Sequence, residues 1–177
     1  MIDFLKKYGL PFGLKKSVKA HATTGYSPSF KEAKSFLIFF TSEGNQKIAT
    51  VKNLQNKLEK EGKTVKCLYL VMKDEDKPDV HLDSGMVRVL VEEFTLFGKI
   101  QNEKANKLLN QDFDFMIHAD VSCSIYSDII LSRAKAKCRI GKYFEDHEAQ
   151  YDMMIGVAGE KGISHLLDQV YHYAKRL

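Results

Sequence analysis

Four residues whose side chains can do chemistry lie close together in the chain: His118, Asp120, Ser122 and Cys123. An imidazole and a carboxylate two residues apart could exchange a proton with a bound ligand. A thiol in the first turn of a helix could have a lowered pKa and act as a nucleophile. The surrounding residues, 112–144, are typical of one βαβ unit, with a strand, a short polar loop, an amphipathic helix and a second strand.

In open α/β sheets, ligands lie beyond the carboxyl ends of the strands. The expected strand at 113–118 ends at His118, the one at 35–41 ends before Ser42, and the one at 137–140 ends near Lys142. We therefore predict a ligand-binding edge that includes seven residues: Ser42, Glu43, His118, Asp120, Ser122, Cys123 and Lys142.

The polar run 120–124 lies where a helix is expected to begin, so free backbone N–H groups and the positive end of the helix dipole favour an anion there. The same residue types are good N-caps, worth about 1 kcal/mol each in ordinary stability. Two interpretations stay open, namely capping alone and a site for a small anionic ligand or a nucleotide near Ser122.

The three cysteines, Cys67, Cys123 and Cys138, are too few and too dispersed for a disulfide framework or a zinc site. Cys67 and Cys138 fall in expected strands and should be core residues, and a free cysteine such as Cys123 is more often a small buried apolar residue than a nucleophile.

A loop folding back could bring Asp146 and His147 to His118 and Asp120 as a metal or acid–base cluster, although charged loops are usually solvated. The chain lacks both G-x-G-x-x-G and the full phosphate-loop motif G-x-x-x-x-G-K-[ST], because Gly62-Lys63-Thr64 has a lysine, Lys57, where that motif needs its first glycine. We expect no metal and no cofactor.

Strands alternating with helices predict how these residues are positioned. Apolar runs predict strands near 35–41, 65–72, 86–91, 113–118, 137–140 and 151–157, and helical periodicity predicts helices over 46–61, 101–110, 122–134 and 162–176. This alternation is typical of βαβ units with right-handed crossovers. We predict a single Rossmann-like three-layer α/β domain over 31–177, with a mostly parallel open sheet, preceded by a basic helical segment over 1–30.

Composition bounds the classes of function. The 177 residues fit one domain, and 44% hydrophobic with 28% charged residues are values of a globular protein rather than a disordered one. No apolar run approaches the roughly 20 residues of a membrane-spanning helix. Residues 1–20 contain Asp3 and scattered lysines where a signal peptide needs an unbroken apolar stretch, so we expect no export signal and a cytoplasmic protein.

The net charge of +4 is concentrated near the N-terminus. Residues 1–34 contain seven lysines against Asp3 and Glu32, an excess of five, and the rest of the chain is near neutral. Because a nucleic-acid binder spreads basic residues over one face, we expect no nucleic-acid partner. Residues 2–20 are a candidate for peripheral membrane contact, but we favour docking of their apolar side on the domain or on a second copy.

Four segments of the chain together resemble a family of small bacterial proteins that carries a domain-of-unknown-function label. The segments are 94–99, 112–117, 134–141 and 151–155, and they represent strand starts and loop glycines. The family consists of single-domain chains of similar length in bacteroidete-type bacteria, which open with a basic helix. The resemblance spans nearly the whole chain and supplies no catalytic residues.

Residues 113–120 and 134–141, separated by a helix, are also similar to the N-terminal half of heptosyltransferase-like glycosyltransferases. In that family a strand of the type YDLVIDL, a helix and a GAKRRIGF strand occur in the same order. Those enzymes also use a second Rossmann-like domain to hold the nucleotide-sugar. The similarity therefore implies a shared half-fold rather than a working transferase.

Three hypotheses about function follow. The first is a non-catalytic binding or interaction module, with a protein or a second copy of the chain as a partner, because no complete catalytic constellation is visible. The second is a transferase-like or hydrolase-like enzyme that uses Glu43, His118 and Asp120. The third is an anion or nucleotide sensor at the helix start near Ser122.

Overall fold

Six parallel strands form one open sheet in the computed structural model, which describes residues 28–73, 85–145, 147–157 and 162–177. The strands are β1 (Ser35–Thr41), β2 (Thr64–Val71), β3 (Met86–Leu90), β4 (Asp112–His118), β5 (Lys135–Lys142) and β6 (Met153–Ile155). Their order is β3-β2-β1-β4-β5-β6, and every neighbouring pair is parallel. The predicted α/β class with a Rossmann-like open sheet is confirmed.

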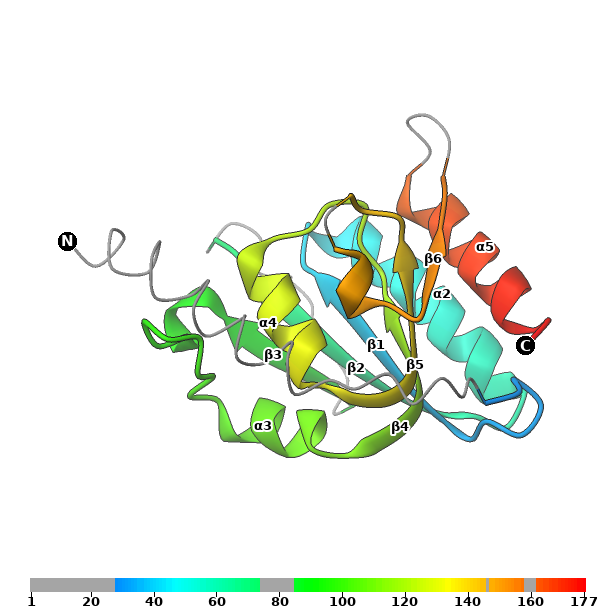
Figure 1. Ribbon diagram of the computed structural model, residues 1–177, viewed down its shortest axis with the longest axis horizontal. Coiled ribbons are helices and arrows are strands. Elements are labelled where there is room, and N and C mark those ends of the chain that lie inside the picture. The colour runs from blue at the N-terminus through cyan, green and yellow to red at the C-terminus, as the bar shows by residue number, and fades with distance from the viewer. Residues whose placement is uncertain (1–27, 74–84, 146, 158–161) are drawn as a thin grey trace.

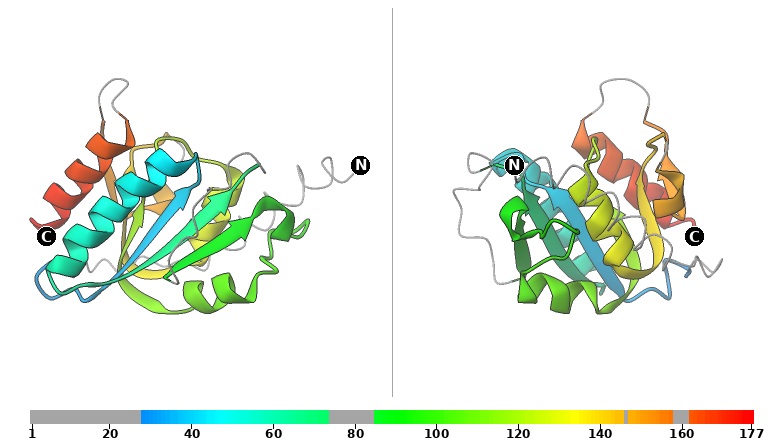
Figure 2. Two further views of the ribbon diagram at one scale, coloured as in Figure 1. Left: turned by 180° about the vertical axis from the view of Figure 1, so that it is seen from behind. Right: turned by 60° about the vertical axis from the view of Figure 1, so that its left-hand side comes forward.

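Helices cover both faces of this sheet (Figure 1). They are α2 (Asn45–Lys60), α3 (Glu103–Leu109), α4 (Ile125–Arg133) and α5 (Ile163–Ala174), with short 3-10 helices η2 (Val91–Glu93) and η3 (Glu148–Gln150). Figure 2 shows α2 and α5 side by side on one face, with α3 and α4 on the other. The fold is therefore a three-layer sandwich with the sheet in the middle.

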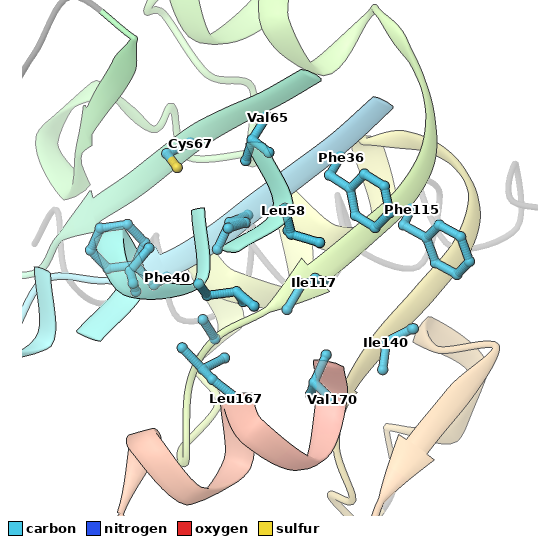
Figure 3. Close-up of a cluster of buried hydrophobic side chains, with 14 of the residues drawn as sticks. Phe36, Phe40, Leu58, Val65, Cys67, Phe115, Ile117, Ile140, Leu167 and Val170 are labelled. Carbon is cyan, nitrogen blue, oxygen red and sulfur yellow. The ribbon is translucent and has the colours of Figure 1, made fainter. Parts of the chain in front are cut away.

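The core has two halves because β1 is apolar on both of its faces. Phe36, Ile38 and Phe40 point toward α2 and α5, whereas Leu37 and Phe39 point toward α3 and α4. Figure 3 shows the first half, in which side chains of β1, β2, β4 and β5 meet Leu58 of α2 and residues of α5. A continuous apolar run is the expected pattern for a central parallel strand covered on both sides.

The six expected strands and the four helices expected over 46–61, 101–110, 122–134 and 162–176 all occur, most of them with shifted ends. The helix predicted over 122–134 begins three residues later, at Ile125, because Ser124 rather than Ser122 is its N-cap and accepts from the Ser127 N–H at 3.1 Å. The strand predicted over 137–140 extends to 135–142. The strand predicted over 151–157 is shorter, since only 153–155 pair with β5.

Some predictions fall outside the described residues. The basic segment over 1–30 is described only from residue 28, and the membrane-contact candidate 2–20 not at all. Phe30, which is described, packs edge-on against Phe36 and against Tyr171 of α5. Within the described part of the chain, no helix combines the length and the apolar character needed to span a bilayer.

Candidate functional site

A buried carboxylate, Asp120, joins the ends of the two central strands. Its oxygens accept from the Thr41 backbone N–H at 2.8 and 3.1 Å and from the Thr41 hydroxyl at 3.0 Å. They also face His118 Nε2 at 3.0 Å and form an ion pair with Lys47. The side chain of Asp120 is 1% exposed. The acceptor capacity of this carboxylate is used inside the protein.

Lys47 reaches Asp120 from the first turn of α2. Residues 47, 51, 54 and 58 share one face of that helix at the helical period, so the lysine lies on the buried face and is itself 4% exposed. Gly44, which precedes the helix, has φ of 85°, a left-handed conformation that favours glycine and turns the chain from β1 into α2. The same ammonium group binds Glu43 at 2.8 Å.

The chain changes direction in the sheet between β1 and β4, where Phe39 pairs with His118. Such a switch point is the usual ligand crevice of open α/β sheets. Here it contains the ion pair between Lys47 and Asp120, both buried. The protein's own lysine thus occupies the position where these folds usually receive a ligand.

His118 extends this network toward β6. Its Nδ1 lies 2.7 Å from the Tyr151 hydroxyl, and its ring stacks on Phe39 with centroids 5.1 Å apart. A carboxylate only accepts, so we assign the proton to Nε2, which donates to Asp120, while Nδ1 accepts from Tyr151. Gly141 makes this approach possible, because a Cβ there would lie 2.5 Å from Cε1 of Tyr151 and 3.3 Å from Cβ of His118.

A second polar cluster lies at the start of α4. Asp128 Oδ1 accepts from the Cys123 thiol at 3.1 Å and lies 3.0 Å from His147 Nδ1. Tyr151 also interacts with Cys123, so this cluster continues the network of His118 and Asp120. Burial raises the pKa of Tyr151, and the neighbouring Cys123 and the charge of Asp128 raise it further.

The thiol of Cys123 is not activated. Burial raises its pKa, and the charge and hydrogen bond of Asp128 raise it further. A nucleophilic cysteine needs the opposite shift, toward the thiolate. This argues against the nucleophile interpretation of Cys123. Cys67 and Cys138 are buried core residues, as predicted.

The seven predicted site residues separate into an interior group and a rim. Three of them, Ser42, His118 and Asp120, are fully buried. The other four are at least partly accessible: Glu43, Ser122, Cys123 and Lys142. His118 lies in the interior of the edge, because β4 and its neighbours enclose the imidazole.

One further expectation about this edge, the approach of Asp146 and His147, can be compared with the structure. His147 contacts Asp128 rather than His118 and Asp120, and Asp146 lies outside the described residues. Tyr143 is 50% exposed and does not fill the edge. Lys142, on the rim, donates to the Val121 carbonyl at 3.0 Å and lies 5.6 Å from the centre of the Phe144 ring.

Sequence reasoning missed three members of the network: Lys47, Asp128 and Tyr151. A signal existed for Lys47, a charged residue at helical spacing with Val51 and Leu54. For Asp128 the signal was a carboxylate directly before the apolar run 129–131. Tyr151 had none, because its partners lie 28 and 33 positions away in the chain.

A polar groove of about 400 Å³ lies away from this edge, between α2 and α5. The Lys57–Asp168 ion pair, at 3.0 Å, bridges the two helices there. Its lining residues are Thr50, Asn53, Leu54, Asn56, Lys57, Lys60, Ser164, Leu167 and Asp168.

The fold and the edge together define an α/β protein with a fully parallel open sheet. The switch point of this sheet, between β1 and β4, is filled by the side chains of Lys47, Asp120 and His118. The chain belongs to a family of unknown function (DUF6913), whose model matches residues 6–177. The predicted membership of a domain-of-unknown-function family is thus confirmed. No curated protein and no solved structure matches the chain.

Proposed function

We propose that the protein is a non-catalytic binding module whose ligand contacts the rim of the carboxyl edge. One observation carries this proposal: Asp120, His118 and Lys47, which an enzyme would present to a substrate, are bonded to one another and buried. Buried charges that are fully paired hold structure in place and are not available to a ligand.

In this proposal the interior network positions the rim. It connects the loop after β1 through Thr41 and Lys47, the loop after β4 through Asp120, and the segment before β6 through Tyr151. The accessible side chains of Glu43 and Ser122 then lie on loops that the buried network fixes. Lys142, at the end of β5, donates to Val121 of the second loop. A protein surface, including a second copy of this chain, is the partner class that we favour.

The anion or nucleotide sensor has less support. The first turn of α4 contains Asp128, and a carboxylate already occupies the positive end of that helix dipole. The glycosyltransferase-like alternative rests on the sequence resemblance described above. All three cysteines are free thiols, which is the usual state in a reducing cytoplasm, where we place the protein.

The stability of network variants tests the proposal. Asp120→Asn and Lys47→Met should each lower the free energy of unfolding by about 3–5 kcal/mol, because each leaves a buried group without its partner. Glu43→Gln is the matched control, since it removes the exposed partner of the same lysine and should cost less than about 1 kcal/mol. Urea denaturation measures all three. Unchanged or increased stability in Asp120→Asn would indicate a functional site held under strain and would contradict the proposal.

A ligand and turnover panel tests the enzyme alternative directly. A ligand at 100 times its Kd adds about 2.7 kcal/mol of stability, so thermal shifts report binding of nucleotides or nucleotide-sugars. We expect no shift with either class and no turnover of nucleotide-sugars in proton NMR. Turnover that disappears in His118→Asn would establish the enzyme alternative instead. Light scattering over a concentration series then measures self-association.

A further inference from the structure

The second cluster, at the start of α4, has the donor set of a metal site. It offers a sulfur from Cys123, a carboxylate oxygen from Asp128 and an imidazole nitrogen from His147, all within 4.8 Å of one another. Asp128 is buried, whereas Cys123 and His147 are partly exposed. The three come from the loop after β4, the first turn of α4 and the residue before η3.

We propose that Cys123, Asp128 and His147 bind a thiophilic divalent cation of the zinc class. The proposal deepens the proposed function, since it supplies the binding module with a ligand at the rim of the same edge. Two of the three donor separations are already close to those around a tetrahedral ion. Metal–ligand distances of about 2.0–2.3 Å place neighbouring donor atoms roughly 3.5 Å apart. Asp128 Oδ1 lies 3.1 Å from the sulfur and 3.0 Å from the nitrogen.

Mixed sulfur, nitrogen and oxygen ligands select the ion class. Thiolate and imidazole suit Zn²⁺ and its substitute Co²⁺, whereas Mg²⁺ and Ca²⁺ prefer oxygen alone. One thiolate and one carboxylate also balance the double positive charge. Three protein ligands leave a fourth position, which the partial exposure of Cys123 and His147 opens to solvent.

Neighbouring groups would orient these ligands. Tyr151 interacts with Cys123, and the Phe144 ring packs edge-on against His147 with centroids 6.1 Å apart. Such outer contacts fix ligand orientation in metal sites. The network that ends at Tyr151 thus connects the interior of the edge to the proposed ion.

Metal binding at this site has a defined proton balance. The Cys123 thiol loses its proton to solvent when sulfur binds the ion. Nδ1 of His147 faces the Asp128 carboxylate, so its proton moves to Nε2 and the ring binds the ion through Nδ1. Asp128 exchanges its two hydrogen bonds for a bond to the metal. About one proton should therefore be released for each ion bound.

Cobalt titration of the full chain tests the proposal. We expect one Co²⁺ per chain, a thiolate-to-cobalt charge-transfer band in the near ultraviolet, displacement of the band by Zn²⁺, and release of about one proton per ion in a pH-indicator assay. Cys123→Ser should abolish the band, and His147→Gln should weaken binding more than the roughly 10–100-fold that loss of an outer-shell contact costs.

Matched controls keep the test specific. Cys67→Ala removes a buried core thiol and His172→Gln removes an exposed histidine of α5, and neither should change the band or the affinity. Circular dichroism confirms that each variant is folded. No band, a stoichiometry far below one, or a band that survives in Cys123→Ser would overturn the metal site. The Asp120→Asn stability measurement is unaffected by that result, so the two proposals can fail separately.

Discussion

Asp114 connects the amino ends of β1 and β4, opposite the candidate site. It accepts from the backbone N–H groups of Lys34 at 2.8 Å and Ser35 at 3.1 Å, and from Lys137 Nζ at 2.8 Å. Burial raises the pKa of Asp114, but the hydrogen bonds from Lys137, Lys34 and Ser35 outweigh it and lower the pKa from 3.8 to about 2.

This lowered pKa predicts a pH dependence of stability. Because the folded pKa is below the unfolded one, Asp114 stabilises the fold above about pH 4, and this contribution is lost as the pH falls toward 2. Since Lys137 is more than half exposed, we expect Asp114→Asn to cost roughly 1–2 kcal/mol at pH 7. The difference from the natural protein should shrink toward pH 2 in urea titrations. Asp112→Asn, at an exposed position, is the control, and equal pH profiles for the two variants would refute this account.

Gly141 is the residue that admits Tyr151 to its position beside His118. In Gly141→Ala the new methyl group would overlap the Tyr151 ring, so we expect a loss of roughly 1–3 kcal/mol from overpacking. The NMR signals of His118 should shift as the hydroxyl moves. Gly156→Ala, where a Cβ meets nothing within 4 Å, should change neither quantity. A Gly141→Ala variant as stable as the natural protein would contradict close packing of Tyr151 against residue 141.

At the scale of elements, the α2–α5 pair depends on apolar contact more than on its ion pair. Leu167 of α5 is 3% exposed and belongs to the core cluster under both helices (Figure 3). We expect Leu167→Ala to cost about 2–5 kcal/mol. Lys57→Ala removes the exposed bridge to Asp168 and should cost less than about 1 kcal/mol. Urea midpoints compare the two, and a larger effect for Lys57→Ala would reverse this ranking.

Local pattern was sufficient to predict the elements. The apolar run 35–41 predicted β1 with its observed ends, because both faces of that strand are covered. Element ends were less accurate where two residues could serve the same role. Ser122 and Ser124 can both cap a helix, and only the tertiary position of the loop selects Ser124.

The candidate site was only partly predictable, for a physical reason. The carboxyl-edge rule located His118 and Asp120 correctly at the end of β4. It could not show that their side chains are closed to ligands, because that depends on two residues far away in the chain. Lys47, which pairs with Asp120, lies 73 positions before it, and Tyr151, which contacts His118, lies 33 positions after it. Contacts at such separations are set by strand order, which periodicity does not reveal.

For the whole molecule, strand order makes β1 the shared partner of two halves of the sheet. It pairs with β2 across the α2 crossover and with β4, which comes much later in the chain. The hydrogen bonds that link Asp114 to Ser35 and Asp120 to Thr41 each span 79 positions. Among the strand pairings of the sheet, the join between β1 and β4 is thus the most non-local.

This join has a consequence for the order of events in folding. Long-range parallel pairing forms slowly, because a large loop must close before its contacts contribute. We therefore expect β1, α2 and β2 to be structured in the folding transition state and the contacts with β4 to form after it. In stopped-flow kinetics, Asp114→Asn should speed unfolding and leave the refolding rate nearly unchanged, whereas Val51→Ala in α2 should slow refolding. If Asp114→Asn slows refolding instead, the two halves join before either is complete, and the central strand pair nucleates the fold.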